Sequence, residues 1–523
     1  MTRAGEYDYV VVGGGSAGCV LAARLSEDPS VTVCLLEAGP SDLDDPKILH
    51  LEQWPKLLGS GYDWDYPVEP QACGNSFLRH SRARVLGGCS SHNSCIAFWT
   101  PREDLDEWAA IGCAGWSARE CWPLIARLEN NDGPGDHHGR TGPVTLRQIP
   151  PQDPCGVAVL AAAAAVGLPT VRFNEGVTIT EGAGFFQINA DENNLRMSSS
   201  RSYLHALVGR RRNLVVRTGA WVKRVLLDAG KRVTGAEYLD SGTFKIVHSR
   251  REVILCAGAI DTPKLLMLSG IGPAEHLRDV GINVLVDSPG VGSNLDDHIE
   301  GLVMWEASRP MVTRSTQWWE IGLFARTDQA LDRPDLMMHY GSVPFAMNTV
   351  RWGYPTTSNG FCLTPNVTRG RSRGTVRLRS RDFRDRPKVD PRYLTDPDGH
   401  DIGVLLAGVR LARRIAAQPP LQAWIRRELV PGAGVVTDGE LIDCISKTHN
   451  TVYHPAGTAR MGAAGDPQAV LDPRLRVNGV TGLRVADASV MPFLPAVNPN
   501  ITVMMIGEKA SDLLAEDASQ PRP

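Results

Sequence analysis

Residues 9–25, YVVVGGGSAGCVLAARL, decide the fold of this chain. An apolar run, a glycine-rich turn and a stretch with helical spacing follow one another there, and a second apolar run over 31–36 ends at Glu37. This order is typical of a strand, a turn, a helix and a second strand with an acidic residue at its tip. The sequence therefore predicts a βαβ unit of the Rossmann type.

The glycines of this turn predict a binding site for an adenine dinucleotide. Gly13, Gly15 and Gly18 let the backbone turn tightly and approach a pyrophosphate, and the helix that begins near Ser16 offers it unpaired N–H groups. Glu37 can accept hydrogen bonds from a ribose. The alternative, a glycine-rich surface turn, leaves the flanking strands and Glu37 unexplained.

Length and composition favour an enzyme that acts on a small molecule. The chain has 523 residues, 42% of them apolar, which is enough for more than one layer of core. A formal net charge of −3 argues against a nucleic-acid or anionic-membrane partner. No apolar stretch approaches eighteen residues, so we expect a cytoplasmic protein that does not enter a membrane.

The cysteine content is also typical of a cytoplasmic protein. There are eleven, an odd number, scattered without a C-x-x-C pair. This usage suits reduced, mostly buried thiols better than a disulfide framework or a zinc site, and we expect no metal.

A second glycine-rich turn, ARVLGGCSSHNSC, occupies residues 83–95. Gly87 and Gly88 precede small polar residues, among them Asn93, and a single histidine. A second turn of this kind could hold the far end of the same dinucleotide, which favours a large one such as FAD over NAD.

Other apolar runs predict the remaining architecture. Residues 214–216 and 222–227, beginning at Val222, suggest a hairpin in the dinucleotide domain, and 252–256 suggests a buried strand of its parallel sheet. A strand over 483–485 runs toward Asp487, and a final helix follows. Between about 300 and 450, strands such as 375–379 and a long helix over 402–416 predict a second domain with an antiparallel sheet.

These features together resemble the glucose–methanol–choline (GMC) oxidoreductase family of flavoproteins. The resemblance rests on the opening glycines, on the turn at 83–93 and on segment 258–272, and it covers nearly the whole chain. In the substrate half, the chain most resembles family members that oxidise choline. The segments that carry this resemblance are 61–66, 90–98, 315–319, 335–345 and 448–455.

The resemblance implies an α/β fold in which an FAD-binding Rossmann-like domain is joined to a substrate-binding domain built on an antiparallel sheet. We expect the FAD-binding domain to comprise 1–152, 195–299 and 452–523, and the substrate-binding domain to comprise 153–194 and 300–451. A homodimer is the expected assembly.

Alcohol oxidation requires that a hydroxyl proton leave, that a hydride pass to flavin N5, and that the developing alkoxide find hydrogen-bonding neighbours. His454 precedes a proline and lies near Gly457, so it occupies a sharp turn. A lone histidine is more often structural, and only its pairing with Asn498 in the family motif favours catalysis. By resemblance, His454 accepts the proton and stabilises the alkoxide, while Asn498 lies beside flavin N5.

The resemblance implies four further roles around the flavin. His339 and Ser94 would be additional hydrogen-bonding groups at the alcohol, although Ser94 could equally be a capping serine. Val452 would lie near flavin C4a, where oxygen reacts. His92 would hold FAD through a covalent bond, and the alternative is a histidine packed under the isoalloxazine ring.

A carboxylate and four aromatic residues suggest the substrate pocket. A quaternary ammonium cannot donate a hydrogen bond and is held by charge and aromatic faces. Taken singly, each aromatic is more typical of core packing and Glu300 of a solvated surface, and it is their coincidence with the matched motifs that favours a pocket. The pocket residues are Glu300, Trp54, Trp319, Phe345 and Tyr453.

The resemblance therefore implies that choline is oxidised to betaine aldehyde and then to glycine betaine, with two O₂ reduced to H₂O₂. Alternatives are a dehydrogenase that uses a quinone or another acceptor, a broader primary-alcohol oxidase, a lyase that retains flavin, and a betaine-binding module. Two departures from the family pattern, Pro55 and the run PFLPA at 492–496, are expected at the active-site entrance and leave the substrate range open.

Overall fold

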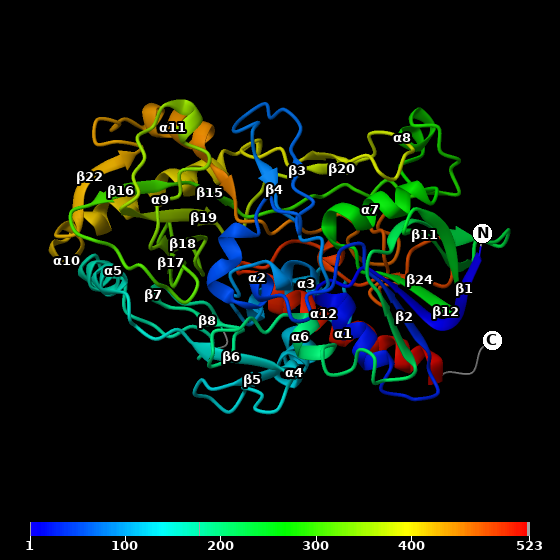
Figure 1. Ribbon diagram of the computed structural model, residues 1–523. Coiled ribbons are helices and arrows are strands. Elements are labelled where there is room, and N and C mark those ends of the chain that lie inside the picture. Colours follow the sequence, from blue (N-terminus) through cyan, green and yellow to red (C-terminus); the bar gives the residue numbers. More distant parts are fainter. Residues whose placement is uncertain (1, 177, 520–523) are drawn as a thin grey trace.

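Two large sheets lie at opposite ends of the molecule in the computed structural model, which describes residues 2–176 and 178–519 (Figure 1). The first sheet has seven strands in the order β10-β11-β12-β1-β2-β9, and β24 pairs with β12. Its strands are β1 Thr2–Val12, β2 Val33–Leu36, β9 Leu214–Arg217, β10 Trp221–Leu227, β11 Val233–Asp240, β12 Thr243–Leu255 and β24 Leu483–Val485.

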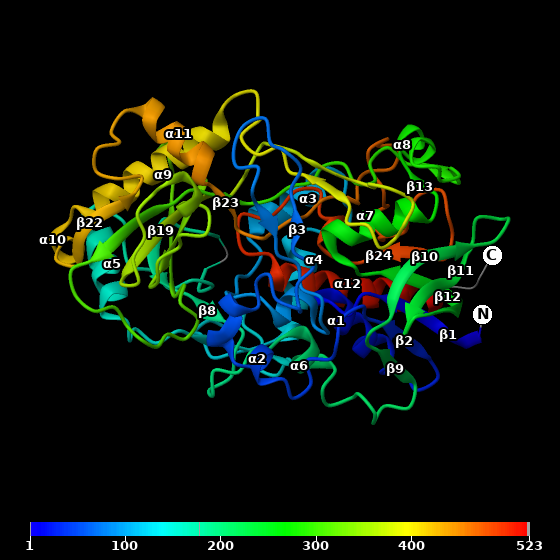
Figure 2. The same cartoon turned by 45° about the horizontal axis from the view of Figure 1, so that its top comes forward.

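The centre of the first sheet is parallel, as the opening sequence predicts. β1 pairs in parallel with both β2 and β12, and Val10 and Val11 are completely buried. Helices α1 Ser16–Leu25 and α12 Asn500–Ser519 run side by side against it (Figure 2). They approach closely at Gly507, where an added Cβ would lie 2.8 Å from the carbonyl oxygen of Ala17.

One predicted pairing in this sheet is wrong. Strands β9 and β10 do not form a hairpin, because β9 pairs in parallel with β2, while β10 pairs antiparallel with β11. Strand β12 does join the parallel sheet as predicted, and helix α7 Gly258–Leu268 follows it.

The second sheet is antiparallel, in the order β22-β16-β19-β18-β17-β7, with β15 paired to β19 and β23. Helices α5 Pro154–Ala165 and α9 His400–Ala416 contribute to the same hydrophobic core. Strand β20 Thr375–Arg377, expected here, pairs instead with β21 Lys388–Asp390 in a separate two-stranded sheet. The strands of the sheet are β7 Gly182–Phe185, β15 Ile299–Glu300, β16 Val303–Ala307, β17 Ile321–Ala325, β18 Leu336–Gly341, β19 Gly360–Val367, β22 Ile425–Val430 and β23 Asn450–Thr451.

Smaller elements connect the two sheets. Strands from both predicted domains meet in a three-stranded sheet in the order β5-β6-β8. Between the sheets lie the helices α3 Arg102–Ala110 and α4 Ala118–Leu128, the 3-10 helices η1 Leu51–Lys56 and η2 Gly88–Ser91, and the strands β5 Glu129–Asn131, β6 Val144–Gln148 and β8 Gln187–Ile188 (Figure 1). Helix α11 Asp438–Thr448 packs with α9 in the core of the second sheet.

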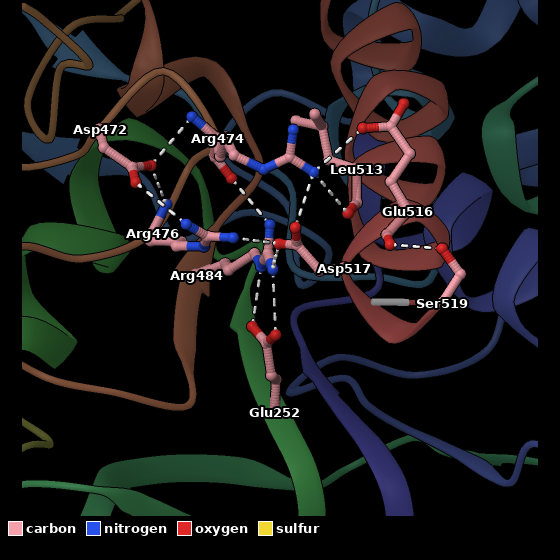
Figure 3. Close-up of polar contacts among 9 residues, drawn as sticks. All are labelled: Glu252, Asp472, Arg474, Arg476, Arg484, Leu513, Glu516, Asp517 and Ser519. Atoms are coloured by element: carbon pink, nitrogen blue, oxygen red, sulfur yellow. Dashed lines mark hydrogen bonds and ion pairs between the residues drawn. The ribbon is translucent and has the colours of Figure 1, made fainter. Parts of the chain in front are cut away.

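The last helix is fastened to the first sheet by ion pairs at its carboxyl end (Figure 3). The Arg484 guanidinium on β24 lies 2.8 Å from the carboxylate of Glu252 and 2.5 Å from that of Asp517. Arg474 and Arg476 also pair with Asp517, at 2.8 and 2.6 Å. Arg484 is almost fully buried, so this network fixes α12, whose first residue is at the site described below.

The strands divide between the sheets broadly as the predicted domains do, while the domain boundaries stay a prediction. All eleven cysteines are free thiols, and nine of them are buried. Among the residues described, no helix combines the length and the apolar character needed to cross a membrane.

Candidate active site

One cavity between the two sheets collects almost every residue that the sequence singles out. Among the predicted site residues, Gly18 and Gly87 do not line it. The predicted residues that line the cavity are Gly13, Gly15, Ser16, Glu37, Trp54, Gly88, His92, Asn93, Ser94, Val222, Glu300, Trp319, His339, Phe345, Val452, Tyr453, His454, Asp487 and Asn498.

The two glycine-rich turns lie back to back at one side of this cavity. The Gly87 N–H donates to the Gly14 carbonyl at 2.7 Å, and a Cβ added to Gly88 would lie 2.6 Å from the Cα of Gly15. Gly13 has a φ of 103°, and a Cβ there would lie 2.4 Å from the Cys256 carbonyl oxygen. A side chain at Gly88 would push the two turns apart, and one at Gly13 would collide with the backbone at the end of β12, so the narrow cradle depends on glycine.

Glu37 is at the end of β2, where a ribose is predicted. Its carboxylate accepts hydrogen bonds from the N–H groups of Gly14, at 2.9 Å, and Gly39, at 2.7 Å. Burial raises its pKa to about 7. Glu37 therefore also braces the first glycine turn, a role that the sequence did not suggest.

Three helices begin at the cavity wall. α1 starts at Ser16 without a side-chain cap, α12 starts at Asn500, and α7 starts at Gly258, whose N–H donates to Asp487 at 2.9 Å. Helix amino termini carry unpaired N–H groups and partial positive charge. This end of the cavity is therefore suited to a pyrophosphate or another anionic group.

The residues present fit a bound dinucleotide. Asn498 Oδ1 and Asn500 Nδ2 are buried, line the cavity and have no hydrogen-bond partner among the described residues. Unpaired buried polar atoms of this kind are unfavourable unless a ligand or water satisfies them. Together with the glycine cradle and the helix termini, they indicate the place of a cofactor such as FAD.

His92 lines the cavity directly after η2. Its Nε2 lies 3.2 Å from the Leu57 carbonyl oxygen and 3.8 Å from the Asp63 carboxylate. Burial lowers its pKa to about 4, so the imidazole is neutral at pH 7. A neutral imidazole is the nucleophilic form that a covalent bond would require.

His454 is connected to a histidine that the sequence analysis did not single out. The Nδ1 atoms of His454 and His298 are 2.9 Å apart, and His298 Nε2 lies 3.2 Å from the Thr368 carbonyl oxygen. A carbonyl only accepts, so His298 carries its proton on Nε2 and accepts at Nδ1. His454 therefore carries its proton on Nδ1, and its Nε2 keeps a free lone pair.

His339 has the complementary arrangement. Its Nδ1 lies 3.2 Å from the Asn366 side-chain nitrogen, which donates, so the His339 proton is on Nε2. The site thus offers one imidazole that accepts a proton and another that donates a hydrogen bond.

Burial keeps these imidazoles uncharged. It lowers the pKa of His298 and that of His339 to about 4. Burial, together with the imidazoles of His298 and His339, lowers the pKa of His454 well below its ordinary range. All three are neutral at pH 7, the state in which His454 can act as a base.

The backbone at His454 is held by Asp297, another residue that the sequence analysis did not single out. The Asp297 carboxylate accepts the His454 N–H at 2.8 Å and the Thr451 hydroxyl at 2.5 Å. Tyr453, between them, has a φ of 65°, which is unfavourable for a bulky residue. Asp297 therefore helps to hold a strained turn that directs both Tyr453 and His454 toward the cavity.

Ser94 and Val452 also face the cavity. Ser94 is not the N-cap residue of any helix that the structure describes, so the capping alternative has no support here. The Val452 N–H donates to the His298 carbonyl at 2.9 Å, which links it to the same cluster.

Glu300 is a buried carboxylate, 6% exposed, that lines the same cavity from strand β15 of the second sheet. Burial raises its pKa to about 7, and hydrogen bonds from Asn450 and Thr364 oppose that rise. Among the described residues, no Lys, Arg or His forms an ion pair with it. Glu300 therefore has an unmatched negative charge when ionised, as a site for a cation requires.

Three of the four predicted aromatic residues form a continuous wall in the same cavity. The Trp54 and Trp319 rings meet edge to face at 5.3 Å, and Trp319 meets Phe345 at 5.7 Å. Trp54 belongs to η1 and donates to the Gln317 carbonyl at 2.7 Å, which fixes its ring.

Neither departure from the family pattern lines this cavity, although the backbone of Pro495 hydrogen-bonds to His298. That they border the entrance stays a prediction. Pro55 does not line the cavity, although Trp54 and Leu58 do. Phe493 packs against Trp108, with ring centroids 6.2 Å apart, and lines a second, arginine-rich cavity. Neither departure therefore alters the wall of the candidate active site.

Comparison with known proteins agrees with this arrangement. The GMC oxidoreductase N-terminal family model matches residues 7–300, and the C-terminal model matches residues 370–507. The chain belongs to the GMC oxidoreductase family. It is thus an FAD-dependent oxidoreductase with the Rossmann-like and substrate-binding domains of that fold.

Individual relatives match almost the whole length of this chain. Choline oxidase of Arthrobacter globiformis is 63% identical over 515 residues, covering 97% of this chain and 94% of that protein. Mitochondrial choline dehydrogenase of Homo sapiens is 35% identical over 543 residues, covering 97% and 90%. The crystal structure of pyridoxine 4-oxidase from Mesorbium loti superimposes with a TM-score of 0.90 at 33% identity, covering 98% and 99%.

Proposed function

We propose that this protein is an oxidase that converts choline to betaine aldehyde and the hydrated aldehyde to glycine betaine, reducing two O₂ to H₂O₂. The observation that carries the proposal is the position of Glu300 and its aromatic wall in the same cavity as His454 and Asn498. The 63% identity to a choline oxidase supports the same substrate.

FAD, when bound, would accept a hydride from the alcohol carbon and pass the electrons to O₂. The two glycine turns and the amino termini of α1, α7 and α12 would hold it. We also propose that the His92 imidazole holds it covalently. A bond would form between the imidazole and the cofactor, each would lose one hydrogen, and O₂ would take up both hydrogens as H₂O₂.

His454 and His339 both act on the substrate oxygen. His454 Nε2 has the free lone pair and takes the hydroxyl proton, while the His339 Nε2–H donates a hydrogen bond to the oxygen as it gains charge. Once protonated, His454 adds a positive charge beside the alkoxide in a site shielded from water. The hydrated aldehyde also presents a hydroxyl, so both oxidations can use the same pair.

Glu300 and the aromatic wall position the trimethylammonium group. An ionised carboxylate and the faces of Trp54, Trp319, Phe345 and Tyr453 offer charge and cation–π contacts, which a quaternary ammonium can use without donating hydrogen bonds.

An oxygen-electrode experiment tests the proposal. With choline we expect two O₂ consumed for each choline, and anaerobic choline should bleach the flavin. Bleaching without oxygen uptake, together with reduction of an artificial acceptor, would instead indicate a dehydrogenase. No bleaching at all would reject choline oxidation altogether.

A further inference from the structure

Glu300 is directly opposite an asparagine in the second sheet. Strand β15 pairs antiparallel with β23, and this pairing places Glu300 across from Asn450. Side chains of directly opposed residues lie on the same face of a sheet and close enough to contact. The Asn450 side-chain nitrogen is indeed 3.1 Å from Glu300 Oε1.

A second asparagine sets the orientation of Asn450. The Asn348 side-chain nitrogen lies 2.9 Å from Asn450 Oδ1 and donates to it. With its oxygen occupied, Asn450 presents its N–H₂ group to Glu300 and, at 3.5 Å, to the Tyr453 hydroxyl. Asn450 and Asn348 are 3% and 9% exposed, so water does not replace these bonds readily.

The charges around Glu300 make this donor important. Asp297 acts on Glu300 as a second negative charge, and the Cys362 thiol and Tyr453 hydroxyl nearby are neutral at pH 7. With no cationic partner among the described residues, the ionised carboxylate depends on hydrogen-bond donors. Asn450 is the amide donor that contacts it, and a hydrogen bond to a charged group is stronger than one between neutral groups.

We propose that Asn450, oriented by Asn348, is a positioning residue that gives this site its preference for cationic over neutral alcohols. It keeps Glu300 ionised and directed at the substrate. This inference rests on the proposed oxidation of choline and names a residue through which that specificity is set. Asn450 also donates to the Tyr453 hydroxyl at 3.5 Å, so the same hydrogen bonds connect one aromatic residue of the pocket to the carboxylate.

The test compares choline with its neutral isostere 3,3-dimethylbutan-1-ol. In Asn450→Leu we expect kcat/KM for choline to fall about tenfold or more, since a hydrogen bond to a charge is lost, while the value for the isostere changes less than about twofold. Asn348→Ala should lower the choline preference in the same direction by a smaller factor.

A double-mutant cycle separates this role from a structural one. In a Glu300→Gln background, Asn450→Leu should cause no further loss of preference, because the charge that Asn450 serves is gone. Asn189→Leu, at a buried asparagine that donates to the Met197 carbonyl, is the matched control and should leave the preference unchanged.

Three outcomes are decisive. If Asn450→Leu and Asn348→Ala both keep the wild-type preference, or if the losses in the double mutant simply add, the inference is wrong. If Asn450→Leu does not fold with FAD, Asn348→Ala decides the question alone. If the wild type itself shows no preference for choline, the proposed function fails instead.

Discussion

The Nδ1 atoms of His298 and His454 lie 2.9 Å apart, and this contact decides which nitrogen of His454 can act as a base. The Thr368 carbonyl holds the His298 proton on Nε2, so His298 accepts from His454. Without these two consecutive hydrogen bonds, the His454 proton could occupy either ring nitrogen. His298 is therefore a positioning residue for the predicted catalytic histidine.

Replacing His298 should alter the pH profile as well as the rate. In His298→Phe we expect kcat to fall about tenfold or more, because the His454 lone pair is no longer fixed toward the substrate. His298 lowers the pKa of His454, so its removal should move the acid limb of kcat/KM for 3,3-dimethylbutan-1-ol to higher pH. A lower rate with an unchanged pH profile would indicate a purely structural role.

His454→Ala removes the base itself. We expect kcat and kcat/KM to fall together by about 10²–10⁴, since the interaction is made only as the hydroxyl proton leaves. Flavin content, read from the absorption spectrum, should stay normal because the glycine cradle is untouched. A variant with near-normal kcat would transfer the role of base to His339.

The covalent link at His92 is tested by acid precipitation. The precipitated wild-type protein should remain yellow, whereas His92→Asn should release its colour into the supernatant, because the asparagine side chain does not form this bond. If the wild type also releases free FAD, the cofactor is held by contacts alone.

Glu300→Gln should abolish most of the preference for the positive charge. Two interactions favour the cation: an ion pair at about 4 Å, with an effective dielectric of about 20, and a cation–π contact. Desolvation removes roughly half of their summed free energy, and the remainder corresponds to about a hundredfold in kcat/KM. Wild type should prefer choline to 3,3-dimethylbutan-1-ol by about this factor, and the variant should still oxidise the isostere. Equal rates for both alcohols in wild type would indicate a general primary-alcohol oxidase.

The same preference should depend on pH. Burial raises the pKa of Glu300 to about 7, so below pH 7 the carboxyl is mostly protonated and neutral in the free enzyme. The ratio of the two kcat/KM values should therefore fall by about tenfold per pH unit below 7 and level off above it. In Glu300→Gln the ratio should not vary with pH, and a slope in that variant would assign the titration to another group, such as Asp297.

The sequence by itself determined the βαβ unit and the dinucleotide cofactor, and through the family resemblance it predicts the residues of the substrate pocket. The glycine turn at 13–18 is a local pattern, because backbone geometry there requires glycine whatever surrounds it. His454 and Glu300 were singled out through resemblance to a family, and that resemblance already contains the outcome of folding.

The tertiary structure decided what depends on residues far apart in the chain. Strands β9 and β10 look like a hairpin locally, yet β9 pairs with β2, because strand partners depend on how the whole sheet assembles. His298 and Asn450 give no local signal, since their partners His454 and Glu300 are 156 and 150 residues away. Proton position and carboxylate charge are set by buried neighbours, and only the folded chain brings those neighbours within hydrogen-bonding distance.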